Sequence, residues 1–110
     1  MTTPLLVLTT LPDRPSAERL AAALVEARAA ACVSILGACA STYRWQGKIE
    51  TAEEIPLLIK TTQAAYARLE AIVRAQHPYE LPEIVAVPVS GGLSAYIQWM
   101  AQETTLPDEE

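Results

Sequence analysis

Two kinds of hydrophobic pattern alternate along this chain, and together they predict its helices and strands. Residues 5–8 and 84–89 are continuous apolar runs bounded by proline or glycine, which is typical of strands buried on both faces. Residues 16–31 and 63–76 carry apolar side chains three and four positions apart, with charged residues between them, which predicts two amphipathic helices. A third helix is expected from Ser94 onwards.

Between the two main helices the pattern predicts a long β-hairpin. An extended segment is expected over residues 32–45, a turn at residues 46–48 and a second extended segment over residues 49–61. Gly47 supplies the backbone freedom that a tight turn needs. Both arms exceed the usual strand length of about 5–6 residues. Pro56 inside the second arm removes a hydrogen-bond donor, so we expect this arm to bend.

The ends of the two main helices also carry signals. Ser16, which follows Pro15, is the expected N-cap of the first helix. His77 precedes Pro78, and a residue before proline is pushed out of the helical region, so the second helix should end there.

The predicted order of elements is strand, helix, strand, strand, helix, strand and a terminal helix. This is the α+β, ferredoxin-like βαββαβ arrangement, in which right-handed crossovers place both main helices on one face of the sheet. Because the apolar runs predict burial on both sides, the third helix and partner subunits should cover the opposite face. The 110 residues fit one domain, residues 1–110, with an acidic tail over about residues 104–110 that we expect to be disordered.

Composition and charge exclude some classes of partner. The net charge is −5 and the eight basic residues are scattered, whereas nucleic-acid binding needs clustered Lys and Arg. No apolar stretch reaches the about 18 residues of a membrane span, and the N-terminus lacks the basic start of a secretory signal. Two cysteines, Cys32 and Cys39, make no disulfide framework, so we expect reduced thiols and a cytoplasmic location.

Several local motifs then stand in a fixed order. They read Ala30-Ala31-Cys32-Val33, Tyr43-Arg44-Trp45-Gln46-Gly47-Lys48-Ile49-Glu50, Lys60-Thr61-Thr62, His77-Pro78-Tyr79-Glu80-Leu81-Pro82-Glu83-Ile84 and Tyr96-Ile97-Gln98-Trp99. Each block alone is a weak signal, but five in register resemble the CutA (divalent-cation tolerance) family over nearly the whole chain.

The resemblance implies a ferredoxin-like subunit in a compact homotrimer, similar in architecture to the PII signalling proteins. In that family the long hairpin reaches across to neighbouring subunits and extends their sheets. It also implies a non-enzymatic role in divalent-cation tolerance, with copper or another divalent cation bound weakly. The residues agree with the assembly, because over-long strands and an exposed strand edge invite pairing with another chain.

The candidate metal ligands are His77, Glu54 and Cys32. His77 is the only histidine, and zinc usually takes three or four protein ligands, so a carboxylate or thiolate would have to help. The alternative is that the ring of His77 hydrogen-bonds the last carbonyls of its helix. Cys32 could equally be a small buried hydrophobe, because no basic neighbour in sequence lowers its pKa.

The chain departs from its family at two expected ligand positions. In some bacterial relatives, copper is associated with a cysteine just after the first strand and with two adjacent histidines before the Pro-Tyr pair. Here these positions read Thr9, Gln76 and His77, so a tight copper site of that kind is not expected.

A second group of residues could line a cleft or an interface between subunits. Trp and Tyr combine a large apolar area with one polar group, which suits subunit contacts, and Lys60 could form a salt bridge with a glutamate of a neighbouring subunit. The group comprises Tyr43, Trp45, Lys60, Tyr79, Glu83, Tyr96 and Trp99.

Three functional hypotheses remain open. The first is the trimeric, non-enzymatic protein of cation tolerance. The second is a PII-like small-molecule sensor that uses a cleft between subunits, and the third is an enzyme that uses the same cleft, because a fold does not fix a function. The chain has no Gly-rich phosphate loop, no Gly-x-Ser-x-Gly motif and no Cys/His pair with an orienting acid, which favours the non-enzymatic hypotheses.

Overall fold

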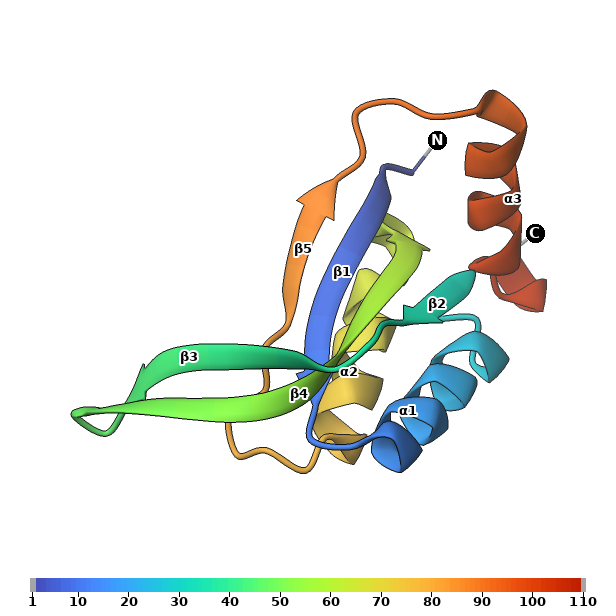
Figure 1. Ribbon diagram of the computed structural model, residues 1–110. Helices are drawn as coiled ribbons and strands as arrows, with labels where there is room; N and C mark the ends of the chain where they lie inside the picture. Colours follow the sequence, from blue (N-terminus) through green and yellow to red (C-terminus); the bar gives the residue numbers. More distant parts are fainter. Residues whose placement is uncertain (1, 110) are drawn as a thin grey trace.

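The computed structural model describes residues 2–109 and shows an α+β fold with one main antiparallel sheet and a projecting hairpin (Figure 1). The strand order is β2-β4-β1-β5, with β3 paired to the outer half of β4, which is the ferredoxin-like arrangement predicted from the sequence. The elements are β1 Pro4–Leu11, α1 Arg14–Glu26, β2 Cys32–Ile35, β3 Cys39–Trp45, β4 Lys48–Thr62, α2 Tyr66–Gln76, β5 Val85–Pro88 and α3 Ser94–Glu103, with 3-10 turns at Gln63–Ala65 and Pro107–Glu109.

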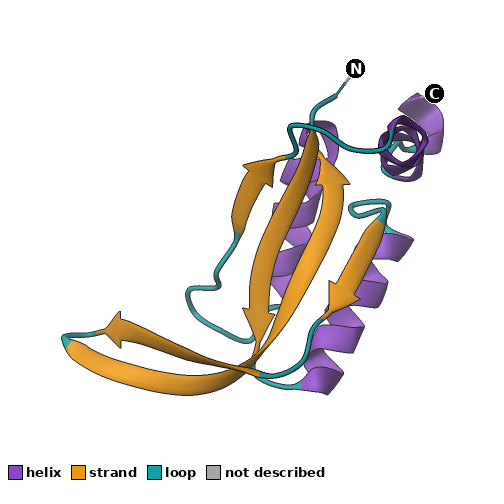
Figure 2. Ribbon diagram, turned by 45° about the horizontal axis from the view of Figure 1, so that its top comes forward, coloured by secondary structure: helices purple, strands orange, loops and turns teal. Residues whose placement is uncertain are grey.

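Helices α1 and α2 cover one face of the sheet, as the crossover rule predicts (Figure 2). Their apolar faces pack on alternate residues of β1 and β4, which point toward the helices because successive strand residues face opposite sides. The buried core comprises Leu5, Val7, Leu11, Ala17, Leu20, Leu24, Ala29, Ala30, Ile55, Leu57, Ile59, Leu69 and Val73.

The prediction that residues 5–8 and 84–89 are buried on both faces is wrong for the single chain. Strand β1 alternates strictly between buried and half-buried residues, and all four residues of β5 are exposed. The reason is that both main helices lie on the same side of the sheet, so the other side has no covering layer of comparable size.

The first helix begins earlier than predicted, because its N-cap is Asp13 and not Ser16. The carboxylate of Asp13 accepts a hydrogen bond from the Ser16 backbone N–H at 2.8 Å, which satisfies one of the free donors of the first turn. This contact lowers the pKa of Asp13 below its ordinary value. Ser16 supports the same turn by donating its hydroxyl to the Asp13 carbonyl at 3.0 Å.

The predicted extended segment over residues 32–45 is two strands, β2 and β3, separated at residues 36–38. Strand β2 joins the main sheet, whereas β3 pairs with the outer half of β4 in the hairpin. The hairpin turn is Gln46-Gly47, one residue shorter than the predicted turn at residues 46–48 because Lys48 already pairs in β4, and both residues have positive φ (50° and 80°), the geometry of a two-residue turn. The hairpin gives the molecule its elongated outline of 47 × 26 × 23 Å.

Strand β4 serves both the hairpin and the sheet, and Pro56 lies where it passes from one to the other. Its outer residues pair with β3 up to Glu54, and its inner residues pair with β1 and β2. The strand changes direction in this region, as predicted (Figure 1). A missing backbone donor is tolerated here because the β3 ladder has ended and the β2 ladder begins only at Leu57.

The C-terminal helix α3 lies beside the end of β4 and the beginning of β2 (Figures 1 and 2). Thr104, which follows it, is buried, and its hydroxyl lies 3.1 Å from that of Thr62. The ordered chain therefore includes Thr104, the first residue of the tail predicted to be disordered. Disorder of the rest of that tail stays a prediction, and Glu110 lies outside the described residues. In residues 2–109, no helix has both the length and the hydropathy that crossing a bilayer requires.

Candidate functional site

A concavity lies between the β3–β4 hairpin and the segment of residues 78–83 that follows α2. It is an open groove of about 720 Å³. Strand β1 contributes one residue at its base, the hairpin forms one wall and the segment after α2 forms the other. The lining residues are Thr10, Ser41, Thr42, Tyr43, Trp45, Glu54, Pro78, Tyr79, Glu80, Leu81, Pro82 and Glu83.

Glu54 is the most deeply buried charged residue of this groove, with only 7% of its surface exposed. Its Oε2 accepts hydrogen bonds from the hydroxyl of Tyr79 at 2.9 Å and from the hydroxyl of Thr10 at 3.1 Å. Both donors are neutral. Within residues 2–109 the recorded contacts of the carboxylate are these two hydrogen bonds and include no salt bridge.

His77 ties the segment after α2 to the first strand. One ring nitrogen, Nε2, donates to the carbonyl of Thr10 at 2.6 Å, and the other, Nδ1, accepts the backbone N–H of Tyr79 at 3.1 Å. These two bonds together require the tautomer that is protonated on Nε2. The expectation that the ring bonds the last carbonyls of its own helix is therefore wrong, because Pro78 forces His77 into an extended conformation (ψ 133°).

Tyr79 is held by the same contacts. Its ring packs at 4.8 Å from that of His77, and its hydroxyl points to Glu54. Burial, followed by the hydrogen bond to the Glu54 carboxylate and its charge, raises the pKa of Tyr79 to about 12. The phenol therefore remains a hydrogen-bond donor at all physiological pH values.

The three predicted metal ligands do not come together. His77 and Glu54 both border Thr10 and Tyr79, but Cys32 lies on β2, where its thiol is 3.7 Å from the Lys60 Nζ. Both ring nitrogens of His77 are already hydrogen-bonded. Among residues 2–109, no cluster of three or more His, Cys, Asp or Glu side chains could hold a metal ion. The described residues thus do not fit a tight divalent-metal site.

Cys32 has a basic neighbour that the sequence did not reveal. It is the cross-strand partner of Lys60, whose Nζ also donates to the hydroxyl of Ser34 at 3.2 Å. Cys32 and Cys39 are both free thiols and lie on separate strands.

The two positions at which the chain departs from some relatives also lie apart from the groove lining. Thr9 is fully buried on the side of β1 that packs against the helices, and its hydroxyl has no hydrogen-bond partner. Gln76 is exposed at the end of α2.

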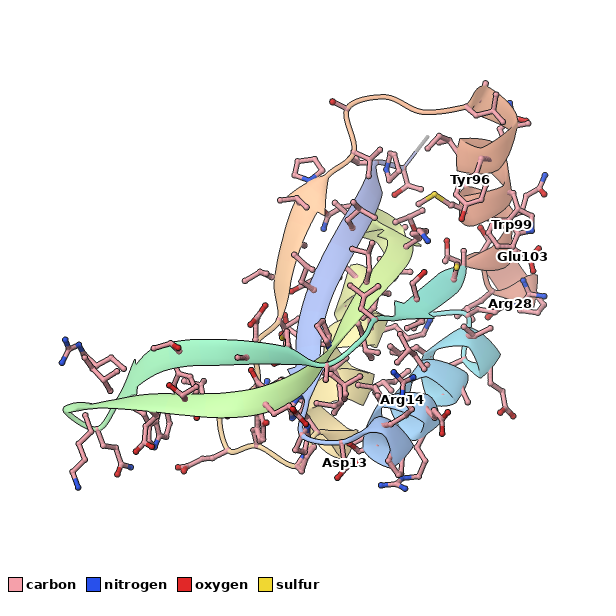
Figure 3. All side chains as sticks on the ribbon, in the orientation of Figure 1. Asp13, Arg14, Arg28, Tyr96, Trp99 and Glu103 are labelled. Atoms are coloured by element: carbon pink, nitrogen blue, oxygen red, sulfur yellow. The ribbon has the colours of Figure 1, made fainter. Side chains whose placement is uncertain are left out.

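The predicted cleft residues divide between the groove and two other places. Tyr43, Trp45, Tyr79 and Glu83 do line the groove. Lys60 lies beside Ser34 on the side of the sheet that faces away from α1 and α2. Tyr96 and Trp99 stack on each other along α3, with ring centroids 5.3 Å apart (Figure 3).

Sequence reasoning missed other members of the groove, notably Thr10 and Glu80. The alternation of β1 could have indicated Thr10. It places this polar residue on the side of the strand that the two main helices do not cover, where a hydroxyl needs a hydrogen-bond partner. Glu80 lines the same groove as the predicted cleft residue Glu83.

A second surface, which we call the open face, is the side of the sheet away from α1 and α2. Register places Leu6 between Lys60 and Val87, and Leu8 between Leu58 and Val85, so these side chains share one face. Val85 and Val87 are 50% and 48% exposed. An apolar face of this kind, at an unpaired strand edge, is typical of a surface that contacts another chain.

Comparison with known proteins gives one consistent result. Residues 5–103 match the model of the family described as CutA1 divalent ion tolerance protein. The chain is 46% identical over 98 residues to the divalent-cation tolerance protein CutA of Thermus thermophilus, covering 89% of this chain and 95% of that protein. It superposes on CutA from Xylella fastidiosa with a TM-score of 0.91 and 48% identity, over 94% of this chain and all (100%) of that one.

Proposed function

Because this chain belongs to the CutA1 divalent ion tolerance family, we propose that it acts as a cytoplasmic homotrimer in divalent-cation tolerance without catalysing a reaction. The observation that carries the assembly is the open face, an apolar surface next to a hairpin that projects from the body of the subunit, whereas the role in cation tolerance is supported by the family match.

The open face supports assembly because two rows of apolar side chains, one on β1 and one on β5, would otherwise remain in contact with water. Each apolar side chain removed from water contributes about 1.5–3 kcal/mol when it is fully buried, and Val85, Val87, Leu6 and Leu8 lie side by side. Among residues 2–109, strand β5 pairs only with β1, so its other edge has no partner strand there. A neighbouring hairpin could pair with that edge and cover the valines.

The hairpin supports the same assembly because it supplies the complementary surface. Tyr43, Trp45 and Ile49 are 44%, 38% and 69% exposed, and an isolated two-stranded hairpin is marginally stable in water. Contact with a second subunit would bury these side chains and fix the hairpin. Three copies related by rotation would allow each subunit to give one hairpin and receive another.

The assembly can be tested with a matched pair of variants. Val87 lies on the open face and Val25 on helix α1, and the two side chains are similarly exposed in the single chain, at 48% and 45%. We expect Val87→Asp to dissociate the oligomer in size-exclusion chromatography with light scattering, because a buried unpaired carboxylate is costly. Val25→Asp should leave the mass unchanged. Equal behaviour of the two variants would exclude the open face as the interface.

In this proposal a divalent metal ion binds only weakly. The hydrogen bonds that the candidate ligands already make are the reason. A cation at His77 would have to displace the bond to either the Thr10 carbonyl or the Tyr79 amide. A cation at Glu54 would compete with two hydroxyl donors. Calorimetric titration with Cu²⁺ and Zn²⁺ should therefore give dissociation constants far weaker than those of three- or four-ligand sites. A submicromolar site in the isolated protein would contradict this part of the proposal.

A second candidate function is a small-molecule sensor of the kind that PII-like architecture suggests. The groove favours it, because a concavity of about 720 Å³ lies within the usual range of about 300–1,000 Å³ for small-molecule sites. In the assembly proposed above, the hairpin wall of this groove would lie against a neighbouring subunit, so the sensor would use a cleft between subunits.

A further inference from the structure

Within the main sheet the open face carries one charged side chain, Lys60, on the inner strand β4. Register places Lys60 in one row with Cys32 on β2, Leu6 on β1 and Val87 on β5, so it has sheet on both sides. No other charged residue occurs in those three strands or in residues 57–62 of β4, all of which the structure describes. The surface that the proposed assembly buries therefore contains an ammonium group.

Within residues 2–109, Lys60 has no carboxylate among its recorded contacts. Its Nζ lies 3.2 Å from the hydroxyl of Ser34 and 3.7 Å from the thiol of Cys32, and both acceptors are neutral. In the single chain Lys60 is half-buried, so water still solvates part of the ammonium group. Removing that water is strongly unfavourable unless an opposite charge replaces it. Assembly through the open face thus favours a partner surface that brings a carboxylate to Lys60.

The projecting hairpin offers such a carboxylate among side chains that need burial (Figure 1). Glu50 is exposed on the outer half of β4 and is the cross-strand partner of Tyr43. Trp45 lies two residues beyond Tyr43 on β3, so all three side chains share one face of the hairpin. The two aromatic side chains are 44% and 38% exposed. A hairpin laid with this face on a neighbour's open face would bury both rings and carry the carboxylate with them.

The position of Glu50 along the hairpin distinguishes it from the other two glutamates nearby on β4. At about 3.3 Å per strand residue, Glu50 lies about 13 Å farther out than Glu54. Glu54 is buried and already accepts two hydroxyl hydrogen bonds in its own chain. Glu53 is exposed, but it is three residues from Glu50 and therefore points to the opposite face of the hairpin. Glu50 is thus the carboxylate best placed to reach into another subunit.

We infer that Glu50 of one subunit forms an ion pair with Lys60 of its neighbour, and that this pair fixes the register in which the hairpin packs on the open face. The inference rests on the proposed trimer and adds the contact that selects its geometry. Apolar contact is non-directional, whereas a buried charge is stable only in an arrangement that pairs it. The apolar rows therefore drive association, and the ion pair makes one arrangement the preferred one.

A charge exchange tests the pair. Lys60→Glu and Glu50→Lys each bring like charges together and should raise the protomer concentration at which the trimer dissociates by at least about a hundredfold. The double variant Lys60→Glu/Glu50→Lys restores opposite charges and should recover most of this loss. Its matched control is Lys60→Glu/Glu53→Lys, which has the same net charge and should stay dissociated.

The assay is light scattering on a dilution series, at a fixed urea concentration at which the wild-type trimer dissociates within the measurable range. Circular dichroism on the same samples shows whether each variant is folded. Equal recovery in both double variants, or recovery in neither, would overturn the inference.

Neutral variants keep the test decisive if Lys60→Glu does not fold. Glu50 is exposed, so Glu50→Gln should fold. It leaves the ammonium group unpaired in the interface and should raise the dissociation concentration at least about tenfold. In a Lys60→Met background that group is absent, so the same Glu50→Gln change should cost little more. Strictly additive losses would show that the two side chains do not interact.

The mass of the wild-type protein separates this inference from the proposed function. A wild-type trimer whose dissociation is unaffected by Glu50→Lys would refute the ion pair and leave the assembly intact. A wild-type chain that remains single at micromolar concentration would refute the trimer, and the ion pair with it.

Discussion

Thr9 and Thr61 offer a test of the packing because the same substitution at each should have opposite effects. Both side chains are fully buried on the helix-facing side of the sheet, at 0% exposure. The hydroxyl of Thr61 donates to the Ala29 carbonyl at 2.6 Å, whereas the hydroxyl of Thr9 has no partner. Valine has nearly the shape of threonine, so each substitution changes little except the hydroxyl.

The magnitudes follow from these contacts. A hydroxyl buried without a hydrogen bond costs about 1–3 kcal/mol, so Thr9→Val should stabilise the protein by about 1–2 kcal/mol. Thr61→Val removes a short hydrogen bond and leaves the carbonyl of Ala29, itself a fully buried residue, without that donor, so it should destabilise by about 1–2 kcal/mol. The two variants should therefore differ by about 2–4 kcal/mol.

The assay is urea unfolding followed by circular dichroism. All three proteins must be compared at one protomer concentration, because assembly makes apparent stability depend on concentration. Unchanged slopes with shifted midpoints would show that stability itself has changed. If Thr9→Val destabilises the protein as much as Thr61→Val does, the hydroxyl of Thr9 has a partner in solution and the reasoning about this part of the core is refuted.

Three further predictions concern the hairpin and the groove. Ile49→Asp places a charge on the most exposed apolar side chain of the hairpin (69%) and should lower the mass measured by light scattering; an unchanged trimer would place the hairpin outside the interface. The pKa of Tyr79 lies near 12 against an ordinary 10.0, so the neutral phenol stabilises the fold fully below about pH 10, and this contribution is lost as the pH rises toward 12. Thermal unfolding of Tyr79→Phe should accordingly show a shallower loss of stability over that range than the wild type, and parallel curves would contradict the assignment. Gln46→Asn should raise the melting temperature slightly, because asparagine tolerates the positive φ of 50° better than glutamine; a lower melting temperature would refute the turn geometry.

The order of elements could be predicted from the sequence because each signal was local. Helical spacing, the proline after His77 and the glycine at position 47 act within a few residues, and each is followed by the predicted element, although α1 ends at Glu26 and not at residue 31. The separation of β2 from β3 could not be read in the same way. It depends on which half of β4 each strand pairs with, and this choice is made by contacts distant in sequence.

The candidate site was predictable only in part, for the same reason. Tyr79 and Glu83 belong to a recognisable motif, and they do line the groove. The partner of His77 is a carbonyl 67 residues away, and Lys60 meets Cys32 across 28 residues. Neither contact can be predicted from the hydrophobic pattern around its residues, so the sequence analysis missed both.

The measurement that tests the account most directly is the mass of the wild-type protein in solution at micromolar concentration, determined by light scattering. An apolar open face beside a projecting hairpin predicts a particle of three chains that persists on dilution. A stable particle with the mass of one chain would contradict the account.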